Sequence, residues 1–373
     1  MALSTSVYGS VGTPRVFCDL IQWARAINYV EEYKSSGLEE IGNTREGDVW
    51  GFNPARTSTF ALGTGFNPDS NGTLQVEFKN YDSYHDKNQQ FRLLLQTTNY
   101  YAILNHNLGL LGADRWIEGK SRSGYTDDID DFVGHSNCQN QIGYNIFKIN
   151  KFYNDSHPDG IPLSYFDEIG IRINRGDIAW GTEHLTIGAI SMGRYFDLPH
   201  SVDLGVAQKF SFDEIKTQRT ITGDEITRIE GLKPDWGELS PWTHIDLANY
   251  DNASQGFLNE DYRTASFKGR RSWKLRFNFI SKEKMFPRTF DGNMGGFYDV
   301  DTNEFNVNDE TYHYDSIVAN WMNFTMNGTL KFLFQPNSTK QDFAICRLSS
   351  NSVKIQQTAT NLYEFSATIV ETW

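Results

Sequence analysis

The stretch Ser272-Trp-Lys-Leu-Arg-Phe-Asn-Phe-Ile-Ser281 decides the fold class of this chain. Its apolar members Trp273, Leu275, Phe277 and Phe279 alternate with the polar Lys274, Arg276 and Asn278. An alternation of period two, with one apolar and one polar face, indicates a half-buried antiparallel strand. The same pattern returns at residues 330–334, 343–347 and 363–373. We therefore expect an antiparallel sheet over the C-terminal part of the chain.

A different spacing interrupts these strands at residues 312–326. Tyr314, Ile317, Val318 and Trp321 stand three or four residues apart, which is typical of a helix with one apolar face. Asn327-Gly328 is a suitable helix stop. Residues 268–373 are thus predicted to form a β-sandwich with one packed helix, and Trp273 and Trp321 are predicted to lie in its core.

The preceding part of the chain also consists of short β segments. Residues 100–104, 169–173 and 182–195 alternate as strands do, and Asn71-Gly72 is predicted to form a hairpin turn. Residues 113–165 are predicted to form a long, polar, irregular loop. The expected fold is mostly β, with an N-terminal segment (1–45), a first antiparallel sandwich (46–200), a linking segment (201–267) and the C-terminal sandwich (268–373).

Composition restricts the class of protein. The chain carries 34 basic and 47 acidic residues, a net charge of −13, and its mean hydropathy is −0.52. No apolar run approaches 18 residues, so we expect no membrane span. The longest basic cluster, residues 268–276, alternates along one predicted strand, and we expect no direct nucleic-acid binding. Residues 1–14 lack the features of an export signal.

Candidate chemical sites are weak. Cys18, Cys138 and Cys346 lie too far apart for a disulfide framework or metal-ligand spacing. Gly134-His-Ser-Asn-Cys138 places reactive types side by side, whereas a nucleophile and its base must face each other across a cleft. We predict no catalytic residue, no cofactor and no metal site.

Two acidic stretches leave calcium as an open alternative. Residues 299–310 carry acids at several positions of a calcium-binding loop, but Glu304 stands where the sharp turn requires glycine. Residues 127–131 gather four aspartates: Asp127, Asp128, Asp130 and Asp131. We favour solvated acidic loops in both places.

Aromatic residues indicate where the protein makes contacts. Trp236 and Trp242 fall in predicted loops, and Trp373 ends the last predicted strand. Indole rings in such positions are frequent at subunit interfaces. We take these three residues as candidate interface residues.

Several stretches resemble structural proteins of tailed bacteriophages. Asn99-Tyr-Tyr-Ala-Ile-Leu-Asn-His-Asn-Leu108 resembles the strand and turn of phage proteins with a galactose-binding-like jelly roll, and residues 190–201 resemble the exit of that domain. Gly269-Arg-Arg-Ser-Trp-Lys-Leu275, Phe332-Leu-Phe-Gln-Pro336, Phe343-Ala-Ile-Cys-Arg347 and residues 361–373 are similar to the tail-tube-like sandwich of distal tail and tail-tip proteins. The resemblance leaves out residues 113–165 and 201–260.

The resemblance implies a non-enzymatic virion protein of the tail tip, adaptor or baseplate, made in the host cytoplasm. It implies self-association in six-fold or three-fold rings and contact with other tail or baseplate proteins. We expect the aromatic face of the C-terminal sheet to lock subunits together. Two alternatives are a carbohydrate-binding receptor module that contacts host surface glycans, and a capsid decoration protein.

Overall fold

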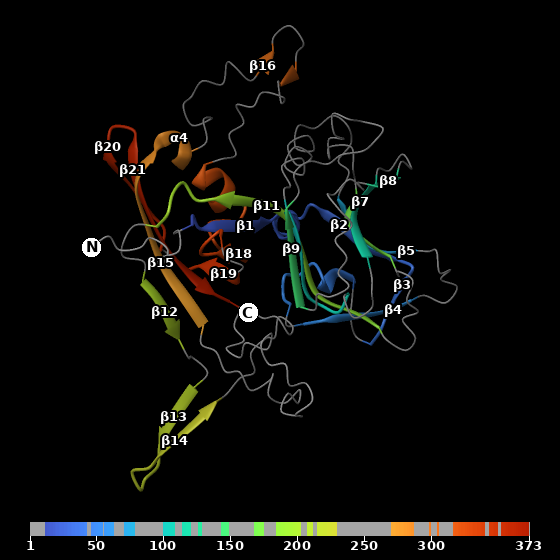
Figure 1. Cartoon of the computed structure of the whole chain (residues 1–373), viewed down its shortest axis with the longest axis horizontal. Helices are drawn as coiled ribbons and strands as arrows, with labels where there is room; N and C mark the ends of the chain where they lie inside the picture. The colour runs from blue at the N-terminus through green and yellow to red at the C-terminus, as the bar shows by residue number, and fades with distance from the viewer. Residues whose placement is uncertain are drawn as a thin grey trace, which may run out of the picture. The chain divides into compact units, whose positions relative to one another are not determined.

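The structure of the 373-residue chain is a computed structural model. It describes residues 12–42, 46–54, 56–62, 71–78, 100–108, 114–120, 126–128, 143–148, 168–174, 184–202, 207–211, 215–229, 270–286, 298–299, 304–305, 316–339, 343–349 and 352–372. The fold is mostly β with antiparallel sheets, as the sequence predicts (Figure 1).

The chain forms two compact units, neither of which is one continuous segment. The C-terminal unit contains Met1–Asp19, Tyr195–Asp213 and Gly269–Thr372, and the sandwich unit contains Leu20–Arg194, Glu214–Lys268 and Trp373. The sequence analysis predicts consecutive segments and assigns residues 1–19 to a separate N-terminal segment (1–45). They join the C-terminal unit because β1 (Arg15–Asp19) pairs antiparallel with β18 (Phe332–Gln335), more than 300 residues away.

The sheet of the C-terminal unit contains the four strands predicted from alternation. β15 (Arg270–Ser281) lies beside β21 (Leu362–Glu371), followed by β19 (Ala344–Leu348), β18 and β1 (Figure 1). β12 (Ala207–Ser211) forms the other edge beside β15, and β20 (Lys354–Ala359) pairs with the first half of β21. β20 escaped the sequence analysis because its polar side chains show no apolar alternation.

The predicted helix is shorter than expected and of another type. A π-helix spans Val318–Met322, and α4 (Lys282–Met285) is a separate short helix. Residues 306–315, where the prediction begins, lie outside the described residues. Asn327 and Gly328, the predicted stop, take left-handed φ values of 55° and 82°, but the helix ends earlier, at Met322. A side chain at position 328 would also collide with Leu348, whose Cβ would lie 2.2 Å from the added atom.

The core of the C-terminal unit lies between its sheet and the π-helix. Trp273 meets Phe334, Phe277 meets Phe365, and the Trp321 ring lies 5.6 Å from Phe332 and 5.7 Å from Phe365. Trp273 is 3% exposed and Trp321 is 0% exposed. Their predicted core positions are confirmed.

A bulge corrects the sequence interpretation of β15 at one residue. The register with β21 shifts between Phe277 and Ile280, and Phe279 takes a left-handed φ of 59°. The extra residue transfers Ile280 to the buried face and leaves Phe279 77% exposed. Simple alternation had assigned Phe279 to the apolar face, because a sequence pattern does not reveal where a bulge changes the phase.

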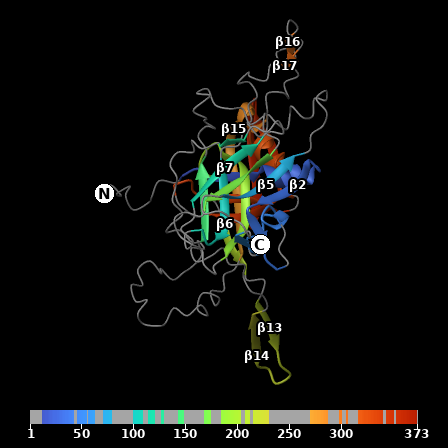
Figure 2. The same ribbon diagram turned by 90° about the vertical axis from the view of Figure 1, so that its right-hand side faces the viewer.

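The sandwich unit is built from two antiparallel sheets. One has the order β2 (Val30–Ser36), β5 (Asn71–Phe78), β10 (Glu168–Asn174), β7 (Asp114–Lys120), β8 (Thr126–Asp128). Figure 2 labels β2, β5 and β7 of this sheet. The other runs from β3 (Leu38–Glu40) through β4 (Ser58–Leu62), β11 (Leu185–Asp197) and β6 (Tyr100–His106) to β9 (Gly143–Lys148). Alternate apolar residues of both sheets enclose one core that also takes residues of α1 (Leu20–Ala26) and Trp50.

Two sequence predictions fail in this unit. Asn71 and Gly72 begin β5 and pair with Asn174 and Ile173, so they are not a hairpin turn. Gly72 is needed for close packing, since an added Cβ would lie 2.6 Å from Leu38 Cγ. Residues 113–165 contain the strands β7, β8 and β9 instead of an irregular loop. Their mixed polar composition hides the period-two signal.

Smaller elements complete the description. Glu46–Asp48 form a 3-10 turn, and β13 (Ile215–Arg219) pairs with β14 (Glu225–Ile229) as a two-stranded hairpin inside the predicted linking segment (Figure 1). The side chains of Thr220, Thr222 and Asp224 form hydrogen bonds with one another at its turn. β16 (Tyr298–Asp299) and β17 (Glu304–Phe305) form a second, very short pair.

Candidate functional site

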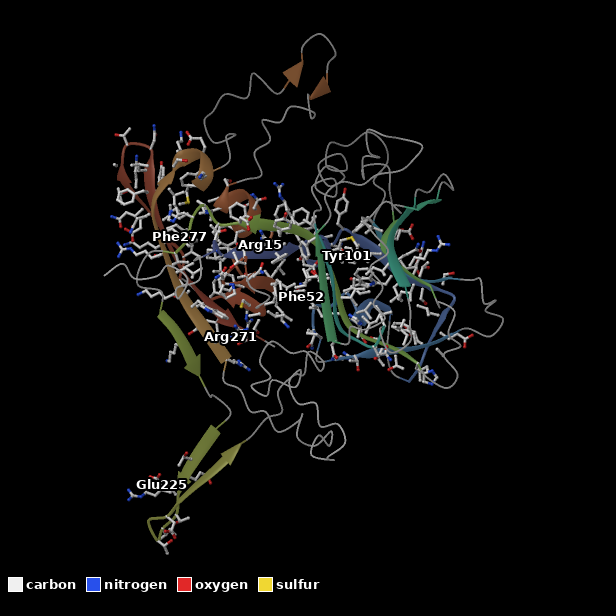
Figure 3. All side chains as sticks on the ribbon, in the orientation of Figure 1. Arg15, Phe52, Tyr101, Glu225, Arg271 and Phe277 are labelled. Atoms are coloured by element: carbon white, nitrogen blue, oxygen red, sulfur yellow. The ribbon has the colours of Figure 1, made fainter. Side chains whose placement is uncertain are left out.

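The polar face of the C-terminal sheet gathers basic side chains from separate parts of the chain. We call this surface the basic face, and it consists of Lys209, Lys274, Arg276, Lys331, Arg347 and Lys354. Lys209, Lys274, Arg347 and Lys354 are exposed, and Lys331 is half-buried. The opposite pleat of the same sheet carries Arg271, Trp273 and Phe277, which are buried, and Figure 3 labels Arg271 and Phe277 on β15.

Strand register places these cations in a two-dimensional array. Lys209 is opposite Ser272, Ser272 is opposite Val370, and Val370 is opposite Arg347. Strands lie about 4.8 Å apart, so Lys209 and Arg347 begin about 14 Å from each other. The pairing of Phe332 with Cys346 places Lys331 beside Arg347 and extends the row by one further strand.

A second row lies further along the same strands. Lys354 is opposite Ser366, which is opposite Arg276. Arg276 binds the carboxylate of Glu364, with its Nε 2.9 Å from Oε1. Lys274 lies between the two rows. The neutral positions between these cations are small or half-buried residues, which leaves the basic side chains prominent.

The charges of the basic face are poorly balanced within the unit. Among the described residues, Glu364 is the carboxylate that forms an ion pair on this face, and it pairs with Arg276. Burial lowers the pKa of Lys331, and the neighbouring Arg347 guanidinium lowers it further. Adjacent like charges on neighbouring strands are destabilising. A chain with 13 more acids than bases therefore keeps a concentrated positive surface at some cost in stability.

The other side of the sheet fixes the strands that carry these cations. Arg271 and Glu371 form a buried ion pair, with side chains 0% and 3% exposed. The Arg271 backbone N donates to Glu371 Oε2 at 2.9 Å, and its guanidinium also donates to the Phe343 carbonyl oxygen at 3.2 Å. This network ties β15 to the end of β21 and to the beginning of β19.

The bulge beside the basic face has its own support. The imidazole Nε2 of His200 lies 2.9 Å from the carbonyl oxygen of Asn278, and its ring packs edge-on against Phe277. Both contacts stabilise the backbone that directs Phe279 outward. An exposed aromatic ring thus borders the array of cations.

The basic face was missed in the sequence because its members come from five separate stretches. Lys274 and Arg276 stand out as part of the cluster at residues 268–276, but Lys209, Lys331, Arg347 and Lys354 are isolated cations in the sequence. One signal was present. Lys274, Arg276 and Arg347 each occupy a polar position of an alternating strand, which predicts the face but not which strands are neighbours.

The expected subunit lock by the aromatic face is corrected by burial. Phe277, Phe332, Phe334 and Phe365 are each 0% exposed within a single chain. Trp321 of the π-helix packs on Phe332 and Phe365, and these four rings leave no exposed aromatic area for a second subunit.

Most of the other residues singled out in the sequence, the candidate interface tryptophans and the cysteines, lie outside the described residues or are buried. Trp236, Trp242 and Trp373 lie outside the described residues, as do Cys138 and residues 134–137. Cys18 and Cys346 are buried free thiols. The Cys18 Sγ donates to the carbonyl oxygen of Asn320 at 3.4 Å, which is a packing role.

The acidic stretches are described only in part. Asp127 and Asp128 lie in β8, whereas Asp130 and Asp131 fall outside the described residues. Asp299 and Glu304 are opposite each other in the β16–β17 pair, and residues 300–303 and 306–310 lie outside the described residues. The described ranges hold no group of three or more side chains suited to a metal ion. Within the same ranges, no helix has the length and apolarity needed to cross a membrane.

Comparison with known proteins leaves the family open. No protein-family model matches the chain, and no curated protein matches it. One solved structure, a pectin binding carbohydrate binding module, aligns with 7% identity and a TM-score of 0.25, covering 44% of this chain and 89% of the module. A likeness of this size carries no argument about fold or function.

Proposed function

We propose that this protein is a non-enzymatic structural component that associates with copies of itself, in the tail tip, adaptor or baseplate of a tailed phage. The assignment to a tail rests on the resemblance of residues 99–108, 190–201 and the C-terminal strands to such proteins. Contacts with other tail or baseplate proteins and a place in the virion belong to the same proposal.

The observation that carries the proposal is the basic face. Four exposed cations without an ion-pair partner among the described residues form an array over several neighbouring strands of one sheet. Concentrated charge without internal compensation is typical of a surface that meets an oppositely charged partner. The sheet beneath it is closed by an aromatic core, so the surface can bind without any change of fold.

The edge of the sheet supports the same function. β20 pairs with β21 on one side, and within the described residues no strand pairs with its other side. Edge strands present unpaired backbone N–H and C=O groups to neighbouring chains. Polar and charged side chains along β20 keep such an edge from indiscriminate aggregation while leaving it open to a specific partner.

Sedimentation velocity of the purified full chain tests this function. We expect a defined oligomer whose population increases with protein concentration. A protein that remains monomeric at every accessible concentration would refute self-association. Saturable binding of a defined host glycan by such a monomer, measured on a glycan array, would replace the proposal with the carbohydrate-binding alternative. Attachment of the labelled protein to heads in electron micrographs would indicate a capsid decoration protein.

A further inference from the structure

Exposed glutamates line two edge strands of the sandwich unit and carry the charge opposite to that of the basic face. Glu31 and Glu32 of β2 and Glu39 and Glu40 of β3 are all exposed. The two strands are consecutive and are joined through Gly37, which has a φ of 69°. β2 is an edge strand of one sheet and β3 an edge strand of the other. We call these four glutamates the acidic edge.

We propose that the basic face of one copy binds the acidic edge of a second copy, in a head-to-tail contact. This inference rests on the proposed self-association and adds the surfaces and the force that carry it. Basic face and acidic edge are different surfaces of the same chain, so the contact is heterologous and repeats from copy to copy. A repeated contact of this kind closes into a ring when its rotation permits.

Charge explains why a second copy is the occupant. The chain has an excess of 13 acids, yet Lys209, Lys274, Arg347 and Lys354 are collected on one face. The rest of the chain is therefore even more acidic than the total, and any other copy offers complementary charge. This array fits another protein surface better than a single polymer strand, because the cations extend over two dimensions, about 19 Å across five strands.

Phe279 adds an apolar element at the border of the basic face. Its ring is 77% exposed, and the backbone maintains a left-handed φ of 59° to present it. Interfaces commonly combine an aromatic anchor with surrounding charged residues. The bulge keeps this ring out of the core, three residues beyond Arg276 along the same strand.

Charge reversal provides the decisive experiment. In the full chain, Lys274→Glu with Lys354→Glu reverses the basic face, and Glu39→Lys with Glu40→Lys reverses the acidic edge. Each double variant alone is expected to weaken self-association about tenfold or more in sedimentation velocity. An equimolar mixture of the two variants is expected to restore it, because each then offers the charge that the other lacks. Raising NaCl from about 0.05 M to about 0.5 M should weaken the wild-type assembly.

A matched control separates this contact from general charge effects. Lys284 is an exposed lysine of α4 that lies outside the basic face. Lys284→Glu is expected to leave assembly unchanged, whereas the same substitution at Lys274 is expected to weaken it. Circular dichroism of every variant establishes that the fold is kept.

The outcomes distinguish this inference from the proposed function. An oligomer that forms normally in both charge-reversed variants would overturn the inference while the proposed self-association stands. A wild-type chain that never associates would overturn both. Failure of the mixture to restore assembly would show that the two surfaces do not bind each other. Binding of duplex DNA that is lost in the face-reversed variant, with assembly intact, would assign the face to nucleic acid and overturn the inference.

Discussion

The buried pair of Arg271 and Glu371 permits a quantitative prediction about the sheet that carries the basic face. Glu371→Leu leaves the Arg271 guanidinium 0% exposed and without its carboxylate. Breaking a buried ion pair on one side costs about 3–5 kcal/mol, because the remaining charge stays desolvated. Arg271 keeps its contacts with the Phe343 carbonyl oxygen and with the ring of Trp273, 4.7 Å from its guanidinium carbon. Neither of them replaces a negative charge.

The double substitution Arg271→Met with Glu371→Leu provides the comparison. It removes both charges and refills the space with apolar atoms, so we expect it to cost less than either single change. Replacing a buried pair in this way is often neutral or stabilising. The prediction is therefore strongly non-additive, with the double variant more stable than Arg271→Met or Glu371→Leu alone.

Hydrogen–deuterium exchange of peptides covering β15 and β21 measures the effect where it occurs. A loss of 3–5 kcal/mol corresponds to exchange about a hundred-fold to a few thousand-fold faster, since 1.4 kcal/mol is a factor of ten. Peptides from β5 and β10 in the sandwich unit serve as the internal reference. If the single variants accelerate exchange less than about tenfold, or if the double variant equals the sum of the singles, the argument from desolvation is wrong.

Further predictions address other features of the two units. Trp321→Ala should reduce unfolding free energy by about 3–5 kcal/mol in urea titrations. Trp321→Phe should cost much less, because the buried indole N–H has no hydrogen-bond partner among the described residues. Phe279→Gly should raise stability by about 1 kcal/mol through relief of the left-handed φ, and a decrease in the urea midpoint would contradict this. Gly170→Ala should lower the thermal midpoint, since an added Cβ would lie 2.3 Å from the backbone oxygen of Leu74. Lys331→Met should stabilise the protein at neutral pH. The folded state disfavours the charged amine, so wild-type stability should rise with pH towards 10.5, and the advantage of the variant should shrink there.

The location of the basic face also limits how such an assembly can form. The aromatic side chains of the C-terminal sheet stabilise the protomer itself, with Trp321 packed on Phe332 and Phe365. Subunits that meet through charged surfaces associate in a salt-dependent manner and keep a soluble, independently folded protomer before assembly. We expect the isolated protomer of this protein to be folded, with assembly controlled by concentration and ionic strength.

The sequence by itself determined the class of fold and most strands of the C-terminal sheet. Trp273, Leu275 and Phe277 alternate with polar residues, and this period of two would not place the apolar side chains on one face of a helix. The local pattern is therefore sufficient to identify a half-buried strand. The left-handed backbone at Gly328 was equally local, because glycine accepts a left-handed φ without steric cost. Such features depend on neighbours within a few residues.

Local pattern was insufficient where a residue's partner lies far away in the chain. Position 72 has to be glycine because the Leu38 side chain packs directly against it. The polar residues of β20 form a strand because they pair with β21. Phe279 left the core because a bulge shifted the register at that point. Strand identity in these cases comes from tertiary contacts that the sequence does not display.

The tertiary structure alone decided the candidate site. Lys209, Arg347 and Lys354 are isolated cations in the sequence, and antiparallel pairing brings their strands together with that of Lys274 on one face. The physical reason is that alternation fixes which side of a strand faces water, whereas the order and register of strands depend on contacts between residues far apart in the chain.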